Sequence, residues 1–217
     1  MALLGWLISR VAVVLLREDW VRLRSEIVRL HTLHCRDSSC APPRIVQAFL
    51  LSAEDHRFFK HRGVDPIAVA RASWRNLMFG RKEGASTVEM QLVRVLTGRF
   101  DRTASRKIRE AAFATLLCSV VPRADIPAMY LRVAYYGTGM VGFSSACKRL
   151  SMAPHSLTDR QAASVVARLK YPEPMHMNEA ARARIDMRTQ HLLRVYARHA
   201  SSRVHHGLVG EPQHAAV

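Results

Sequence analysis

The sequence predicts an essentially all-α protein built as one domain. Its 217 residues suit a single domain, and a hydrophobic content of 49% is enough for an ordinary core. Apolar side chains recur at helical spacing over almost the whole chain, and no alternating pattern of useful length suggests a strand. Helices are therefore expected throughout.

The N-terminal end predicts an apolar segment followed by a long helix. Residues 1–16 are apolar apart from Ser9 and Arg10, but they fall short of the ~20 residues that a spanning helix needs. We expect an interfacial anchor or a truncated span, whose orientation stays open because arginines follow it and no Lys or Arg precedes it. A helix is then expected over residues 20–34, with an apolar face formed by Trp20, Leu23, Ile27 and Leu30.

A second helix is expected after Pro42 and Pro43. It starts near Arg44, and its apolar stripe consists of Val46, Phe49, Leu50 and Ala53. Glu54 follows Leu50 by one helical turn, so its carboxylate is expected on the apolar face rather than on the solvent face.

The rest of the chain continues the helical pattern. Residues 64–79 predict a helix, and residues 80–84 form a charged loop bounded by glycines. Further helices are expected over residues 87–96, 104–121, 124–136, 144–150, 158–169 and 178–199. Beyond about residue 200 the composition turns to His, Gly, Pro and Ser, which predicts a disordered tail.

The charge of the chain predicts an anionic partner. Lys and Arg outnumber Asp and Glu by 33 to 17, a net charge of +16. Nucleic acid, anionic lipid headgroups and a phosphorylated substrate all fit this charge. Aromatic residues make up only 7% and are not interleaved with Lys or Arg, which argues against a nucleic-acid surface.

The cysteines and histidines give little sign of a metal centre. None of Cys35, Cys40, Cys118 and Cys147 belongs to a paired C-x-x-C set, which argues against a zinc site. Cys35 and Cys40 could close a small disulfide if the region is exported, and Cys118 lies in an apolar run that predicts a buried, inert thiol. Solvent-exposed side chains are expected for the C-terminal histidines, which are His191, His199, His205, His206 and His214.

The segment from Glu54 to Gly63 is the first candidate for chemistry. A carboxylate that loses hydration on an apolar face gains proton affinity, so Glu54 is a candidate general base. Arg57, Lys60 and Arg62 follow it closely and would attract an anionic substrate. The alternative is an ordinary helix end with mixed surface charges.

A second candidate begins at Gly84. Ser86 and Glu89 have the spacing of a capping box at a helix start. The free backbone N–H groups and the positive dipole of such an end suit phosphate oxygens, although most capping boxes bind nothing.

The third candidate is the charged face formed by Arg106, Lys107 and Glu110. These residues are three or four positions apart on one helix and could place two cations and a carboxylate around a diphosphate. Glu110 is also a candidate ligand for a divalent metal. The alternative is a solvated helix with surface salt bridges.

The order and spacing of these motifs resemble those of the family 51 peptidoglycan glycosyltransferases. The resemblance covers roughly residues 44–175, and its most specific part is Glu54-Asp55-x-x-Phe58-x-x-His61-x-Gly63. Three further motifs follow in the family's order: Gly84-x-Ser86-Thr87 with Gln91-Leu92, then Arg106-Lys107-x-x-Glu110, then Tyr130-Leu131 with Tyr136-Gly137.

The resemblance implies a fold, a substrate class and residue roles. It implies a lysozyme-like helical head with a small membrane-facing jaw near residues 64–100, acting on lipid II and the growing glycan chain. Glu54 matches the general base, and Glu110 matches the carboxylate that assists departure of the lipid diphosphate, directly or through a divalent cation such as Mg²⁺ or Mn²⁺. Donor-binding positions match Ser86, Thr87, Gln91, Arg106 and Lys107, and motif-supporting positions match Asp55, Phe58, His61, Gly63 and Gly84.

The resemblance also implies a location and a layout. We expect a membrane-bound enzyme at the outer face of the cytoplasmic membrane, with other cell-wall synthesis proteins as partners and no nucleic acid. The expected layout is an apolar segment and leading helix over residues 1–34, a glycosyltransferase domain over residues 35–199, and a tail over residues 200–217.

Several positions depart from the family pattern, and they keep other functions open. Substituted positions are Ala85, Glu89, Met90, Val95, Ala128 and Arg132. They raise the alternative of a weakened or inactive protein that binds lipid II or glycan. A glycan-cleaving enzyme on the same architecture is a further alternative, but the cations at positions 106 and 107 disfavour it.

Overall fold

The computed structural model describes residues 16–37, 41–80 and 84–201, with side chains up to residue 199. The chain divides into two compact units. Unit 1 consists of Met1–Ala41 and Arg57–Val133, and unit 2 consists of Pro42–His56 and Ala134–Val217. Residues 1–15 of the predicted apolar segment, residues 202–217 of the predicted tail, and Cys40 lie outside the described residues.

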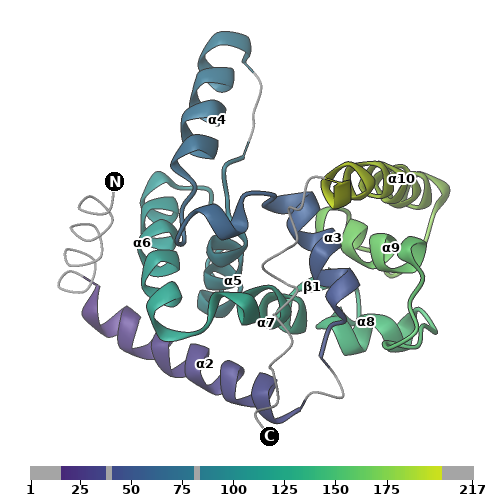
Figure 1. The fold of residues 1–217 in the computed structure, drawn as a ribbon, viewed down its shortest axis with the longest axis horizontal. Helices are drawn as coiled ribbons and strands as arrows, with labels where there is room; N and C mark the ends of the chain where they lie inside the picture. Colours follow the sequence, from purple (N-terminus) through teal and green to yellow (C-terminus); the bar gives the residue numbers. More distant parts are fainter. Residues whose placement is uncertain (1–15, 38–40, 81–83, 202–217) are drawn as a thin grey trace, which may run out of the picture. The chain divides into compact units, whose positions relative to one another are not determined.

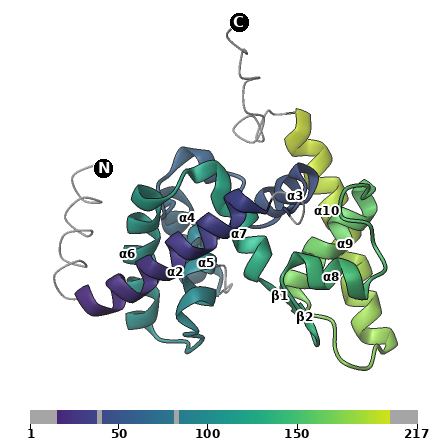
Figure 2. The ribbon, with the colours of Figure 1, turned by 90° about the horizontal axis from the view of Figure 1, so that it is seen from below.

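Unit 1 contains seven helices or helical turns in its described part (Figure 1). They are α2 (Arg17–Arg36), η1 (Phe58–Lys60), α4 (Pro66–Phe79), α5 (Val88–Thr97), α6 (Ala104–Val120), η2 (Arg123–Asp125) and α7 (Ile126–Val133). Figure 2 shows α2 lying across α5, α6 and α7. The four residues predicted for its apolar face, Trp20, Leu23, Ile27 and Leu30, are the buried ones, and Trp20 stacks on Phe113 at 5.9 Å between ring centroids.

Helix α4 projects from the body of unit 1 (Figure 1). Asp65 caps its N-terminus by accepting a hydrogen bond from the N–H of Ile67, and Arg57 Nε donates to the same carboxylate at 2.8 Å. Burial opposes ionisation of Asp65, but hydrogen bonds from the backbone and Arg57 outweigh it and hold its pKa below the usual value. The large apolar side chains near the tip of α4 are exposed, namely Trp74, Leu77, Met78 and Phe79.

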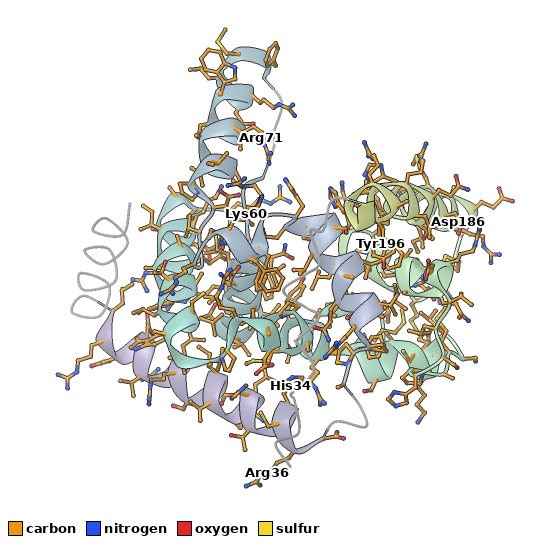
Figure 3. The ribbon with its side chains drawn as sticks, in the orientation of Figure 1. His34, Arg36, Lys60, Arg71, Asp186 and Tyr196 are labelled. Carbon is orange, nitrogen blue, oxygen red and sulfur yellow. The ribbon has the colours of Figure 1, made fainter. Side chains whose placement is uncertain are left out.

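Unit 2 places α3 against the two C-terminal helices. Its elements are α3 (Arg44–Glu54), β1 (Tyr135–Gly137), β2 (Met140–Val141), α8 (Phe143–Arg149), α9 (Asp159–Lys170) and α10 (Glu179–Ser201). The apolar stripe of α3 packs on α9 and α10, and Phe49 stacks on Tyr196 of α10 with ring centroids 4.3 Å apart (Figure 3). The described residues therefore confirm the predicted all-α class.

The predicted helix over residues 124–136 is wrong at its C-terminal end. It stops at Val133, and the chain continues into the hairpin β1–β2, where Tyr135 pairs with Val141. Gly137 has φ +144°, and a Cβ there would lie 2.4 Å from the carbonyl oxygen of Glu173. A helix cannot continue through this conformation, and only glycine allows so close an approach.

No single helix among the described residues has the length and apolar character to cross a membrane. Within the described part of the chain, α6 and Arg123–Val133 reach that length and apolar character when taken together, but the pair is bent by 117°.

Candidate active site

Glu54 is the last residue of α3, and Arg188 of α10 holds it in place. Arg188 Nη2 donates to Glu54 Oε1 at 3.2 Å and lies 3.5 Å from the carbonyl oxygen of Ala53. The Glu54 side chain is 25% exposed and that of Arg188 is 13% exposed. Glu54 thus combines partial burial, which the apolar stripe predicted, with a cationic partner from 134 positions further along the chain.

Asp55 is buried in unit 2, and the rest of the first motif from Arg57 onward belongs to unit 1. Phe58 is buried beneath Arg123, whose guanidinium carbon lies 4.9 Å from the ring centroid. Arg123 also donates to the Phe58 carbonyl oxygen. His61 is buried, with Nδ1 3.8 Å from a carboxylate oxygen of Glu89. These residues form an internal scaffold.

Gly63 fixes the path of this segment against α6. Its φ is +84°, and a Cβ there would lie 2.5 Å from the backbone of Ala114. The Thr87 hydroxyl donates to the Gly63 carbonyl oxygen at 2.6 Å. The first two motifs therefore meet at Gly63.

The predicted capping box of Ser86 and Glu89 is wrong. Thr87 is the N-cap of α5, and its hydroxyl accepts from the N–H of Met90 at 3.3 Å. Ser and Thr can both cap a helix, and the hydrogen bond from Thr87 to the Gly63 carbonyl oxygen favours Thr87 as the N-cap. The Ser86 hydroxyl instead lies 3.4 Å from Arg94 Nη2, which donates to it.

Glu89 is fully buried and does not fold back over the helix end. Its Oε1 lies 3.7 Å from Arg123 Nη2 and 3.8 Å from His61 Nδ1. The Cys118 thiol donates to the same oxygen at 3.8 Å. These cationic and polar groups offset the burial of a charge at a position where the resemblance predicts a neutral side chain.

Two arginines of unit 1 hold the Glu110 carboxylate. Arg94 grips it with two parallel hydrogen bonds, Nε to Oε1 at 2.8 Å and Nη2 to Oε2 at 3.0 Å. Arg106, one turn earlier on α6, donates to Oε1 as well. Glu110 is only 2% exposed, and its hydrogen bond with Arg94 raises the pKa of that guanidinium despite burial.

The arrangement around Glu110 does not fit a divalent cation. Such an ion needs several oxygen ligands, whereas both oxygens of the Glu110 carboxylate accept hydrogen bonds from arginines. Elsewhere in unit 1, His61 Nδ1 and Glu89 Oε1 are donor types that could hold a metal ion, with Arg123 beside them. The need for Mg²⁺ or Mn²⁺ stays a prediction.

The remaining predicted residues divide between the site and the surface. Gln91 Oε1 accepts from the Tyr130 hydroxyl at 2.8 Å, which joins the second and fourth motifs. Lys107 is exposed, although it shares α6 with Arg106 and Glu110. Gly84 is exposed before α5, and a Cβ there would meet no described atom within 4 Å.

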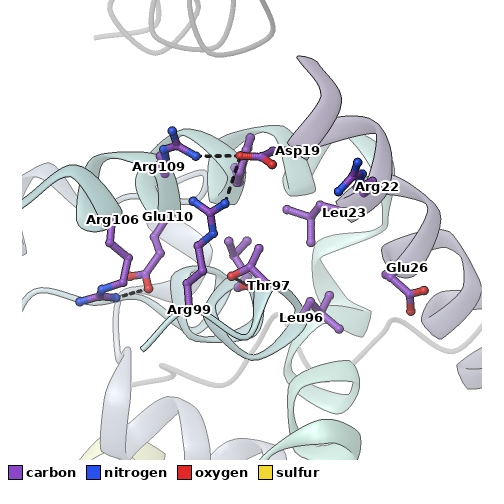
Figure 4. A pocket seen from close by; sticks show the side chains of 12 residues that line it. Asp19, Arg22, Leu23, Glu26, Leu96, Thr97, Arg99, Arg106, Arg109 and Glu110 are labelled. Carbon is purple, nitrogen blue, oxygen red and sulfur yellow. Dashed lines mark hydrogen bonds and ion pairs between the residues drawn. The ribbon is translucent and has the colours of Figure 1, made fainter. Parts of the chain in front are cut away.

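A pocket of about 280 Å³ opens beside Glu110 between α2, α5 and α6 (Figure 4). Asp19 of α2 accepts from Arg109 Nη1 at 2.7 Å and lies 3.6 Å from Arg99 Nη2. The charged lining residues are the cations Arg22, Arg99, Arg106 and Arg109 and the acids Asp19, Glu26 and Glu110. One cation is in excess, so the pocket suits an anionic group that can displace the Asp19 carboxylate.

Sequence reasoning missed Arg94 and Arg188. Arg94 lies on α5, whose N-cap directly follows Ser86, so a helical projection could have placed Arg94 on the side of the helix that begins at Ser86. Arg188 had no comparable signal because its partner Glu54 lies far away in the sequence.

Comparison with known proteins identifies the family. The family model described as Transglycosylase matches residues 31–196, which span all the motifs above. The chain belongs to the transglycosylase family. The resemblance to the family 51 glycosyltransferases is thereby confirmed.

This transglycosylase chain is similar to part of several penicillin-binding proteins named 1A. It is 38% identical over 111 residues to that of Streptococcus oralis, which covers 49% of this chain and 17% of the relative. It is 29% identical over 157 residues to that of Rickettsia felis, which covers 70% of this chain and 20% of the relative. It is 36% identical over 108 residues to that of Escherichia coli, which covers 49% of this chain and 13% of the relative. The chain spans a fifth or less of the length of these relatives.

Proposed function

We propose that this chain is a peptidoglycan glycosyltransferase that polymerises lipid II into glycan strands. The observation that carries the proposal is the buried Glu110 carboxylate, gripped by Arg94 and Arg106 beside a cationic pocket in a transglycosylase domain. Guanidinium groups in this arrangement suit a diphosphate, which is the leaving group of the reaction.

In the proposed reaction Glu54 acts as the general base. Its carboxylate takes the proton from the 4-hydroxyl of the acceptor sugar, and the oxygen attacks the anomeric carbon of the donor with inversion. The bond from that carbon to the polyprenyl diphosphate breaks, and the diphosphate leaves with the electron pair. The arginines around Glu110 stabilise its developing negative charge.

The exposed apolar end of α4 supports action at a membrane surface. Trp74, Leu77, Met78 and Phe79 are between 55% and 82% exposed, which is unusual for four large apolar residues on one helix. A net charge of +16 adds attraction to anionic headgroups. We place the domain at the outer face of the cytoplasmic membrane, beside other cell-wall synthesis proteins.

The proposal is tested with purified protein, detergent and lipid II. Glycan strands are expected from the parent protein, and Glu54→Gln should abolish them while circular dichroism stays unchanged. Glu179→Gln is the matched control, because Glu179 is exposed on α10 in the same unit. Polymerisation by Glu54→Gln at the parent rate would overturn the assignment of the base.

A second candidate is a lipid II or glycan binder without turnover. The observation that favours it is that both acidic groups pair with arginine, Glu54 with Arg188 and Glu110 with Arg94. Tight binding of lipid II without product over long incubation would select this candidate. Any processive product would exclude it.

A further inference from the structure

Three arginines that line the pocket beside Glu110 have no role in the proposed reaction (Figure 4). Arg22 belongs to α2, Arg99 follows α5, and Arg109 belongs to α6. The side chains of Arg99 and Arg109 are 49% and 36% exposed, and Arg22 is exposed as well. All three elements are part of unit 1, so the fold of this unit alone places the three cations around one pocket.

The Asp19 carboxylate marks the position of an anionic oxygen between two of these arginines. Its Oδ2 atom accepts a hydrogen bond from Arg109 Nη1 at 2.7 Å and lies 3.6 Å from Arg99 Nη2. Figure 4 shows both guanidinium groups directed at this one carboxylate. The Asp19 side chain is 36% exposed, and ion pairs with such exposure add little to stability. Another anion can therefore take the place of this carboxylate without unfolding the pocket.

The other acids near the pocket already have partners. Glu110 is held by two arginines, and Glu26 Oε2 lies 2.8 Å from Arg29 Nη2. Asp101 lies outside the lining, and its pKa is lowered chiefly by a hydrogen bond from a threonine hydroxyl, with Arg99 the weakest cause. These three acids therefore do little to neutralise the arginines around Asp19.

The charges that remain in the pocket favour a phosphate group. Asp19 supplies one negative charge against the three positive charges of Arg22, Arg99 and Arg109, which leaves two positive charges uncompensated. A phosphate monoester carries about −1.5 to −2 charges near pH 7 and offers three acceptor oxygens. Guanidinium groups match such oxygens with paired N–H donors. Both the charge and the number of oxygens thus exceed what one carboxylate supplies.

The floor of the pocket is apolar. Leu23, Val93 and Phe113 line it and are at most 4% exposed. Charges above an apolar floor are screened less than charges on an open surface, which strengthens their attraction for an anion. The volume of about 280 Å³ is close to the roughly 300 Å³ at which small-molecule pockets begin. The pocket therefore has room for a phosphate group with a small organic substituent.

We propose that Arg22, Arg99 and Arg109 bind a phosphate group, which takes the place of the Asp19 carboxylate between Arg99 and Arg109. Soluble phosphate and the phosphate of a lipid headgroup present the same chemistry to this site. The net charge of +16 predicted an anionic partner without locating it, and the three arginines give that partner a place. The proposed glycosyl transfer uses none of these four residues, so the site can be tested separately from that function.

The test titrates the full chain with inorganic phosphate at fixed ionic strength, and calorimetry measures the affinity. The parent protein should bind one phosphate per chain. Arg99→Gln and Arg109→Gln should each weaken binding by on the order of tenfold or more, because each removes hydrogen bonds to a charged group. Asp19→Asn should strengthen binding by a similar factor, because the competing charge is gone. Arg24→Gln, which removes the same charge from an exposed position of α2 outside the lining, should leave the affinity unchanged.

A second arm distinguishes the two sources of phosphate. Phosphatidylcholine vesicles with and without phosphatidic acid are sedimented with the parent protein, Arg99→Gln and Arg109→Gln. A gain on phosphatidic acid that both variants lose, without binding of inorganic phosphate, assigns the site to a lipid headgroup. Binding of inorganic phosphate without such a gain assigns the site to a soluble phosphate compound.

Three results would overturn the proposal. The first is an affinity for phosphate that Arg99→Gln, Arg109→Gln and Asp19→Asn all leave unchanged. The second is a folded parent protein that binds phosphate in neither arm. The third is binding that Lys107→Gln loses and Arg99→Gln keeps, which would place the anion at the predicted donor site instead. Circular dichroism checks the fold of each variant, and Arg99→Gln alone carries the test if Arg109→Gln does not fold.

Discussion

Arg188 Nη2 lies 3.2 Å from Glu54 Oε1, and this ion pair fastens the C-terminal end of α3 to α10. The partly buried guanidinium also reaches the carbonyl of the preceding residue, so it fixes the direction of the Glu54 side chain.

Arg188→Met should lower the kcat of lipid II polymerisation by on the order of 10- to 100-fold with little change in KM, because a displaced base loses its alignment. Arg188→Lys should recover part of the activity. Arg184→Met, which changes an exposed arginine one turn earlier on α10, is the control. Equal losses in the two methionine variants would show that the ion pair has no specific role.

Arg94→Met should destabilise unit 1 by about 3 kcal/mol, because it removes two hydrogen bonds from a buried carboxylate. Urea unfolding measures the loss. Combining it with Glu110→Gln should restore part of the stability, since the buried charge that Arg106 alone would then have to compensate is gone. Arg102→Met, at an exposed position, should change the free energy of unfolding by less than about 0.5 kcal/mol. An unchanged free energy of unfolding in Arg94→Met would contradict a stabilising role of the hydrogen bonds between Arg94 and Glu110.

Gly63→Ala should destabilise the protein by about 3 kcal/mol or more. The new Cβ would lie 2.5 Å from the backbone of Ala114, and φ at Gly63 is +84°. Gly84→Ala is the control because a Cβ there meets open space at an ordinary φ. Thermal unfolding of both variants gives the comparison, and similar melting temperatures would refute the close approach.

Cys118 and Cys147 should resist alkylation in the folded protein. Burial raises the pKa of Cys118 to about 12 and that of Cys147 to about 11. A raised thiol pKa means that the reactive thiolate appears only at high pH, so at pH 8 about one Cys118 side chain in 10⁴ is ionised. Iodoacetamide treatment followed by peptide mass spectrometry should find both residues modified only after unfolding. Rapid native labelling of Cys118 would contradict its burial.

Replacing Trp74, Leu77 and Phe79 together by Ser should weaken binding to anionic vesicles by at least tenfold, because about 25 cal/mol is lost for each Å² of apolar area withdrawn from the membrane. The fold should persist because these side chains are exposed. Met187→Ser, at an exposed apolar position of α10, is the control. Vesicle co-sedimentation that does not distinguish the two proteins would remove the basis for a membrane role of α4.

Local patterns predicted most elements, and contacts between distant residues explain what they missed. The buried face of α2 and the stripe of α3 followed from helical spacing because each helix packs along one side. The cap of α5 moved from Ser86 to Thr87 because a carbonyl 24 positions away accepts the Thr87 hydrogen bond. The hairpin at Tyr135 was missed because two short strands leave too little alternation to detect.

The sequence predicted which residues carry charge in the candidate site, but it predicted fewer of the contacts that these residues make. Glu54, Arg106 and Glu110 stood out by motif order, and the i, i+4 spacing of the last two produced the expected contact. Glu89 could not be placed from sequence, because its burial depends on Arg123 and His61, which arrive from other segments.

The meeting point at Gly63 has a consequence for how the chain tolerates change. Its carbonyl holds Thr87, and its α-carbon rests on Ala114, one turn after Glu110 on α6. The first, second and third motifs therefore make contact at Gly63. Inserting or deleting a residue just after Gly63 or just before Thr87 would displace these contacts and misalign the three motifs. Side chains near Gly63 tolerate substitution, as the departures from the family pattern at Ala85 and Glu89 illustrate. The lengths of the segments that meet at Gly63 should tolerate far less change.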